Sequence, residues 1–165
     1  MSLEFGRRHL LFAALAGLAA KIPTAAFAAS PLSGSANGDA DIPTSALLEP
    51  NELVQMLKST QEKPLILQVG VHVLYAQAHV PGSEYIGAAG SLSGLEALRH
   101  RVASVNKARL IVLYCGCCPW ESCPNIRPAF NQLLSMSFTH VKALHVAENF
   151  GTDWVDKGYP VESGR

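Results

Sequence analysis

The stretch LIVLYC, residues Leu110–Cys115, is an apolar run that ends on a cysteine. A continuous apolar run of this length is typical of a strand covered on both faces, as in a parallel sheet. Ligands and catalytic groups in open parallel sheets collect at the carboxyl ends of the strands. The stretch therefore predicts an α/β fold and places Cys115 at the carboxyl end of a strand, where a site is expected.

Elements of two kinds alternate on both sides of this stretch. LILQV, at Leu65–Val69, is a second apolar run of strand length, and apolar spacing with an early proline predicts a helix over Pro50–Lys58. Further helices are expected over 71–78, 91–105, 125–137 and 148–157, and further strands over 84–86, 109–114 and 141–144. This alternation predicts one α/β domain with a mainly parallel central sheet of about five strands and helices on both faces.

Several apolar residues are expected to face the core from the helices of this domain. They are Leu53, Met56 and Leu57 in the first helix, and Ile126, Phe130, Leu133 and Leu134 in the helix over 125–137. Each set recurs at helical spacing, which is typical of a helix that buries one face.

The composition limits the class of function. Of the 165 residues, 48% are apolar, which suits one ordinary core and leaves too little chain for two domains. Lys plus Arg (13) balance Asp plus Glu (13), and the chain contains no long run of like charges. The electrostatic basis for binding nucleic acid or anionic lipid is therefore missing, and we expect small-molecule or thiol chemistry instead.

The first 28 residues have the pattern of an export signal. Arg7 and Arg8 precede an apolar run over 10–20, and the small residues of Ala26-Phe-Ala28 suit a signal peptidase. The segment GRRHLL resembles a twin-arginine signal, which implies the export machinery as a partner. The run is too short to span a bilayer, so no stable membrane span is expected after cleavage, and the mature protein is expected to be periplasmic or otherwise exported.

The mature chain divides into two parts on composition. Residues 29–42 are rich in Ser, Gly, Ala, Asn and Asp, which predicts a flexible linker. The domain itself is expected over residues 43–162.

All four cysteines, Cys115, Cys117, Cys118 and Cys123, lie within the nine residues CGCCPWESC between a strand and a helix. A helix N-terminus stabilises an anion, which favours Cys115 as a nucleophile. Cys115 and Cys118 also form a Cys-x-x-Cys pair, the pattern of dithiol exchange. Four thiolates suit Cu(I) or Zn(II), and a structural disulfide from Cys117 or Cys118 to Cys123 is a further reading. These alternatives stay open at the level of the residues.

Three separated motifs resemble the rhodanese-like domains. The segment YAQAHVPGSEYI, with His79 before an aliphatic residue, Pro and Gly, is similar to the first signature of that family. LIVLYC resembles the strand that delivers its catalytic cysteine, and FGTDWVDKGYPV resembles its closing helix. The resemblance covers roughly residues 43–161, which is nearly all of the expected mature chain.

The resemblance implies sulfur transfer in which Cys115 carries a persulfide between a small sulfur donor and a thiol acceptor. Cys117, Cys118 and Cys123 would then be accessory thiols or disulfide partners, and no cofactor is expected unless Cu or Zn occupies the cluster. His79, Trp120 and Arg127 are expected to support the loop. The loop is longer than is usual in the family, and Glu121 stands where phosphatases of this fold need an arginine, which argues against a phosphatase.

Overall fold

The computed structural model describes residues 41–164. The expected signal peptide (1–28) and nearly all of the expected linker (29–42) lie outside the described residues. None of the helices formed by residues 41–164 has the length and apolar content that a membrane crossing requires.

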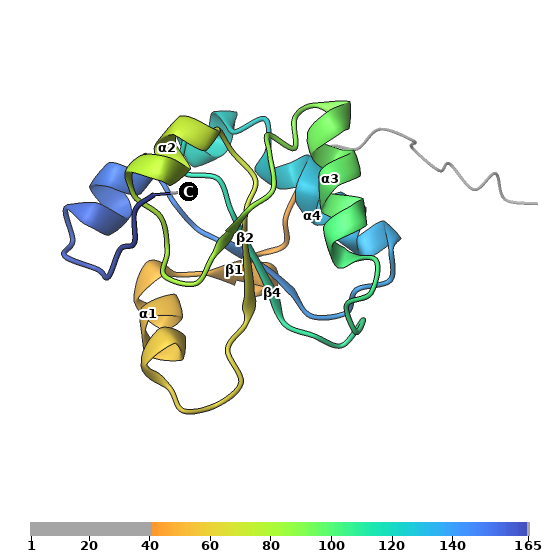
Figure 1. Ribbon diagram of the computed structural model, residues 1–165, viewed down its shortest axis with the longest axis horizontal. Coiled ribbons are helices and arrows are strands. Elements are labelled where there is room, and N and C mark those ends of the chain that lie inside the picture. Colours follow the sequence, from red (N-terminus) through yellow and green to blue (C-terminus); the bar gives the residue numbers. More distant parts are fainter. Residues whose placement is uncertain (1–40, 165) are drawn as a thin grey trace, which may run out of the picture. The chain divides into compact units, whose positions relative to one another are not determined.

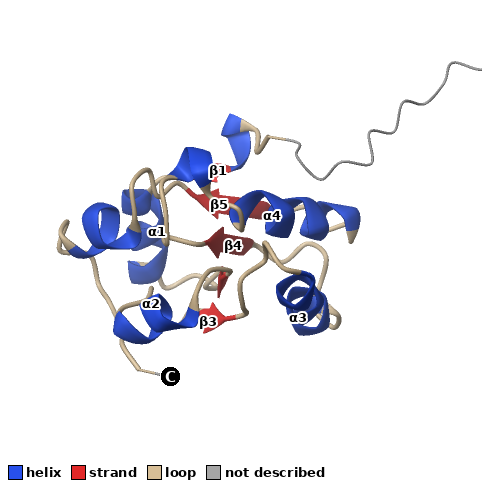
Figure 2. Cartoon of the chain, turned by 90° about the horizontal axis from the view of Figure 1, so that it is seen from above, coloured by secondary structure: helices blue, strands red, loops and turns tan. Residues whose placement is uncertain are grey.

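The centre of the domain is a sheet of five parallel strands (Figures 1 and 2). The strands are β1 (Leu47–Leu48), β2 (Leu65–Gln68), β3 (Glu84–Tyr85), β4 (Ile111–Tyr114) and β5 (Val141–Leu144). Their order across the sheet is β1-β5-β4-β2-β3, so β4 is the middle strand. All four residues of β4 are buried, as its continuous apolar sequence predicted.

Helices cover both faces of the sheet and divide the core into two layers. The longer helices are α1 (Pro50–Lys58), α2 (His72–Gln77), α3 (Leu92–Val102) and α4 (Ile126–Ser135). Figure 2 shows α3 and α4 on one side of the strands and α1 on the other. Ile111 and Leu113 of β4 face the layer that contains the buried residues of α3 and α4, whereas Val112 and Tyr114 face the layer that contains those of α1. This alternation is the two-residue period of a strand buried on both faces, and it confirms the predicted fold class.

Two details of the helices differ from the sequence-based expectation. Leu134 is exposed (47%), and Ala129 takes the buried position beside Phe130 and Leu133 in α4. The expected helix over 148–157 is a single π-helical segment, η3 (Gly151–Val155). The Asp153 carboxylate accepts the backbone N–H groups of residues 148 and 149 there, and so replaces the first helical turn with a loop.

Three short elements were not predicted. They are the two-residue strand β1 and the 3₁₀ turns η1 (Thr44–Ala46) and η2 (Trp120–Ser122). Each of these elements is too short to show a periodicity of its own in the sequence. β1 is held at the sheet edge by its parallel pairing with β5.

Candidate functional site

Cys115 begins the loop that leaves the carboxyl end of the middle strand. Gly116 turns the chain there with a φ of 70°, in the left-handed region that favours glycine. A side chain at this position would also lie 2.6 Å from the Cβ atom of Phe150. Glycine is therefore required for two reasons, and the sharp turn brings the following residues back over Cys115.

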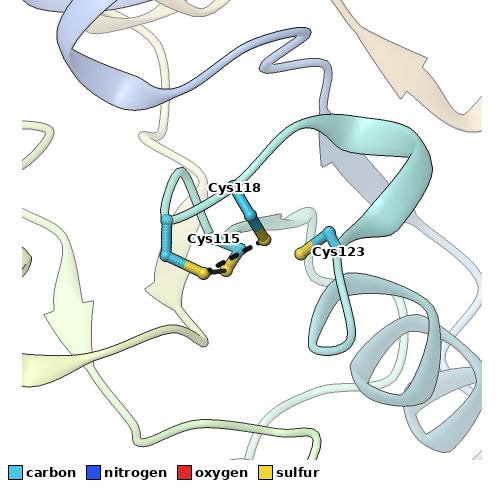
Figure 3. Close-up of side chains that lie close together, drawn as sticks. Cys115, Cys118 and Cys123 are labelled. Atoms are coloured by element: carbon cyan, nitrogen blue, oxygen red, sulfur yellow. Dashed lines mark hydrogen bonds between the residues drawn. The ribbon is translucent and has the colours of Figure 1, made fainter.

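The four cysteine sulfurs form a single cluster. They all lie within 4.8 Å of one another, although their residues are spread over nine positions of the chain. The Sγ atoms of Cys115 and Cys117 are 3.1 Å apart, and those of Cys117 and Cys118 are 3.3 Å apart. Figure 3 shows Cys115, Cys118 and Cys123 with their sulfurs turned toward one another. All four are free thiols in the structure.

Cys123 is the member of the cluster best suited to carry negative charge. Its sulfur accepts a hydrogen bond from the Cys115 thiol and further hydrogen bonds from the backbone N–H groups of Asn125 and Ile126, at the start of α4. These donors lower the pKa of Cys123 to about 5, against the opposing effect of burial. A helix N-terminus favours an anion for the same reason.

Cys115 and Cys118 are shifted in the opposite direction. The Cys115 thiol donates a hydrogen bond to the Cys123 sulfur, and this bond, followed by burial, raises the pKa of Cys115 well above its ordinary value. Burial, followed by the hydrogen bond with Cys117, raises the pKa of Cys118 to about 12. Within this cluster the negative charge therefore rests first on Cys123, with Cys115 as its proton donor. The helix N-terminus thus stabilises an anion on Cys123 and not on Cys115, where the sequence had predicted it.

Two buried polar side chains hold Cys115, and neither was predicted from the sequence to belong to the site. Gln68, at the end of β2, donates to the Cys115 carbonyl oxygen (3.1 Å) and accepts the Gly70 N–H (3.1 Å). Asn125 donates to the sulfurs of Cys115 (3.3 Å) and Cys117 (3.7 Å), while its oxygen accepts the Gly90 N–H (2.8 Å). Asn125 therefore links the cysteine loop to the segment before α3.

The side chains expected to support the loop lie at two different places. His79 stacks on Tyr75 and bonds its carbonyl oxygen through Nδ1 (2.7 Å), away from the sulfurs. The next residue, Val80, donates its N–H to the Tyr114 hydroxyl (3.2 Å), so the turn that contains His79 contacts the residue before Cys115.

Trp120 and Arg127 lie against each other at the outside of the loop. The Arg127 guanidinium carbon is 6.0 Å from the centroid of the Trp120 ring, and NH1 donates to the Trp120 carbonyl oxygen (3.4 Å). The same guanidinium is 3.9 Å from the Glu121 carboxylate and 3.2 Å from that of Asp41. Its charge is therefore shared with two carboxylates.

An open pocket of about 480 Å³ borders the cluster. Cys117 and Cys118 form one wall, and Phe150 and Gly151 belong to the opposite segment. Cys115 lies behind this wall and is only 5% exposed. A ligand in the pocket would therefore meet Cys117 and Cys118 before Cys115.

Comparisons with known proteins agree on the fold. No protein-family model matches the sequence, and none of the curated proteins does. Among solved structures, the rhodanese-like domain of the Alr3790 protein from Anabaena sp. is 24% identical with a TM-score of 0.55, over 72% of this chain and 79% of that one. The chain has a rhodanese-like fold.

Two further structures extend this likeness. The BH2092 protein from Bacillus halodurans is 19% identical, with a TM-score of 0.57, over 72% of this chain and 77% of that one. A thiosulfate sulfurtransferase from Pseudomonas aeruginosa is 24% identical, with a TM-score of 0.51, over 72% of this chain. The matched region is only 19% of that longer protein, so the comparison concerns one domain of it.

Proposed function

We propose that the protein is a sulfur carrier that holds a sulfane sulfur as a persulfide on Cys115. The observation that carries the proposal is the position of Cys115, at the carboxyl end of the middle strand of a rhodanese-like sheet, among three further thiols within 4.8 Å. A solved structure with this fold is described as a thiosulfate sulfurtransferase. A persulfide intermediate divides one difficult transfer into two easier steps.

The first step forms the persulfide with thiosulfate as the donor. The Cys115 sulfur bonds to the outer sulfur of thiosulfate, the sulfur–sulfur bond of the donor breaks, and sulfite leaves with the bonding electron pair. As the new bond forms, the Cys115 proton passes to the Cys123 sulfur, its hydrogen-bond partner. Neighbouring N–H groups of Asn125 and Cys117 donate to the Cys115 sulfur and stabilise its charge.

The second step returns the protein to its starting state. The thiolate of a small acceptor attacks the outer sulfur of the persulfide, and the Cys115 sulfur leaves with the electron pair and recovers its proton. The pocket beside Cys117 and Cys118 is the place for both the donor and the acceptor, because it borders the cluster. Cys117 and Cys118 have to move aside for either molecule to reach the buried Cys115 sulfur. No external oxidant or reductant is needed, since the transferred atom remains a sulfane sulfur in thiosulfate, in the Cys115 persulfide and in the persulfide of the acceptor.

The mass of the intact protein tests this proposal. We expect the reduced protein, treated with thiosulfate and desalted, to gain the mass of one sulfur atom, and peptide mapping to locate it on Cys115. Cyanide, which removes sulfane sulfur, should restore the original mass. A protein that gains no sulfur under these conditions, or gains it only at a residue outside the cluster, would contradict the proposal.

Thiol–disulfide exchange is the second candidate function, and it rests on the 3.1 Å distance between the sulfurs of Cys115 and Cys117. Sulfurs this close need little movement to form or exchange a bond. The same mass measurement separates the two functions, because a disulfide lowers the mass by two hydrogens and a persulfide raises it by a sulfur.

We also propose that the protein acts outside the cytoplasm, on the basis of the paired arginines Arg7 and Arg8 and the Ala26-Phe-Ala28 site. Cell fractionation of the natural host tests this location. Replacing both arginines with lysine should keep the full-length protein in the cytoplasm, and an unchanged distribution would contradict the twin-arginine assignment.

A further inference from the structure

We propose that Cys115, Cys117, Cys118 and Cys123 form a tetrathiolate binding site for one Zn(II) ion. The inference goes beyond sulfur transfer and does not depend on it, because it rests on the geometry and chemistry of the four sulfurs. Within residues 41–164, these residues form a group whose ligand atoms could all reach one ion.

The separations of the sulfurs fit a tetrahedral ion. Zinc–sulfur bonds of about 2.3 Å place the sulfurs of a tetrahedron about 3.8 Å apart. The cluster has two shorter edges, 3.1 Å and 3.3 Å, and no pair farther apart than 4.8 Å. The observed separations therefore extend on both sides of the tetrahedral value, and adjustments of less than about 1 Å at each sulfur would seat the ion.

The backbone delivers the four ligands from different directions. Cys115 follows the end of β4, Cys118 lies after the turn at Gly116, and Cys123 precedes α4 (Figure 3). Cys117 comes from the same turn as Cys118. Ligands that approach from several sides are what a closed tetrahedral site requires, whereas a pair of neighbouring cysteines offers one side only. The eight residues after Cys115 would therefore supply the other three ligands of the ion.

The surroundings of the sulfurs suit an anionic metal–thiolate group. Loading the site releases the remaining thiol protons to solvent, and Zn(II) with four thiolates carries two net negative charges. N–H donors already point at the sulfurs: the Asn125 side chain at Cys115 and Cys117, and the backbone N–H groups of residues 125 and 126 at Cys123. Such outer hydrogen bonds orient the ligands and stabilise their charge.

The donor set selects the ion. Four sulfurs without a histidine or carboxylate ligand disfavour Mg(II) and Ca(II), which prefer oxygen. Zn(II) takes four thiolates in a tetrahedron, whereas a cuprous ion is the principal soft competitor. The number of ligands favours Zn(II), because all four sulfurs are within reach of one ion and zinc binds four ligands.

Zinc binding by the reduced protein under anaerobic conditions tests the site. We expect native mass spectrometry to show one zinc per chain, and Co(II), as a spectroscopic probe, to give the visible bands of tetrahedral thiolate coordination. The half-exposed ligand Cys117 is the residue to change, because a serine there disturbs the core least. Cys117→Ser should weaken zinc binding by at least about a hundredfold, more than the loss of an outer hydrogen bond costs.

A control variant and a stability measurement guard this test against misfolding. Glu121→Gln lies in the same loop and changes an exposed side chain, so it should bind zinc as the original protein does. Zinc should raise the thermal midpoint of the original protein and of Glu121→Gln, but not that of Cys117→Ser. Absence of zinc from the reduced original protein, equal affinity in Cys117→Ser, or binding of cuprous ion alone would each overturn the proposal.

Asn125 is a positioning residue for this site, and Asn125→Asp isolates its role. Aspartate keeps an oxygen acceptor for the Gly90 N–H but loses the N–H donors to Cys115 and Cys117 and adds a negative charge beside the thiolates. We expect zinc affinity to fall about ten- to hundredfold. Because Asn125 is buried, the added charge should also lower the thermal midpoint of the metal-free variant, whereas Asn125→Ser, which supplies a donor without a charge, should recover part of the zinc affinity. Full zinc affinity in Asn125→Asp would show that the amide does not orient the ligands.

Discussion

Replacing Cys115 with serine should reduce sulfur transfer from thiosulfate by at least about a thousandfold, because a hydroxyl is a far weaker nucleophile than a thiol and cannot carry a persulfide. Cys115 is the cysteine at the end of β4, and it is hydrogen-bonded to Asn125, Cys117 and Cys123. Serine is smaller than cysteine and fits the same buried position. The rate of thiocyanate formation from thiosulfate and cyanide is the measurement.

Ser122→Ala, in the same loop, is the matched control for Cys115→Ser. Ser122→Ala removes a hydroxyl that bonds the Pro119 carbonyl oxygen at the surface, and should transfer sulfur at the original rate. Far-ultraviolet circular dichroism of both variants should match that of the original protein. If Cys115→Ser is folded and still transfers sulfur at the original rate, the nucleophile is one of the other thiols and the assignment of Cys115 is wrong.

The strands and helices that follow a clear hydrophobic pattern could be predicted from the sequence. The helix over Pro50–Lys58 and the strand over 141–144 have the expected bounds, because apolar residues recur at the period of each element. The end of the chain behaved differently. A π-helical segment over Gly151–Val155 takes the place of the expected regular helix there, and the Asp153 carboxylate accepts the backbone N–H groups of residues 148 and 149 ahead of it.

The position of Cys115 could also be read from the sequence, but the cluster could not. A cysteine that directly follows a parallel strand lies at the carboxyl end of the sheet, whatever conformation the following loop adopts. Whether Cys117, Cys118 and Cys123 point at Cys115 depends on the turn at Gly116, which no periodicity reports.

The buried amides near the cluster were missed for a related reason. Gln68 lies inside an apolar run, and Asn125 follows a proline before a helix, so each had a local explanation. A polar residue in a fully buried strand was a usable signal, since such groups need a hydrogen-bond partner. In the structure, that partner of Gln68 is the backbone of Cys115 itself.

Zinc should suppress sulfur transfer almost completely, because the proposed ion and the persulfide use the same sulfur. With Cys115 bound to zinc, the charge of its thiolate is shared with the metal and its sulfur is enclosed by three other ligands, so its attack on a donor should be greatly slowed. At a free zinc concentration of about a thousand times the dissociation constant, roughly one chain in a thousand remains metal-free, so the rate should fall about a thousandfold. This expectation rests on both proposals, whereas the direct zinc measurement rests on the metal site alone.

Rate measurements at buffered free-zinc concentrations, under anaerobic conditions, test this competition. The residual rate should follow the metal-free fraction found by native mass spectrometry, and a chelator should restore the full rate. Magnesium at the same concentrations should have no effect, because four thiolates offer it no oxygen ligand. Thiosulfate treatment should in turn delay zinc uptake until the persulfide is removed with cyanide. If fully zinc-loaded protein transfers sulfur at the original rate, Cys115 is not both the persulfide carrier and a zinc ligand.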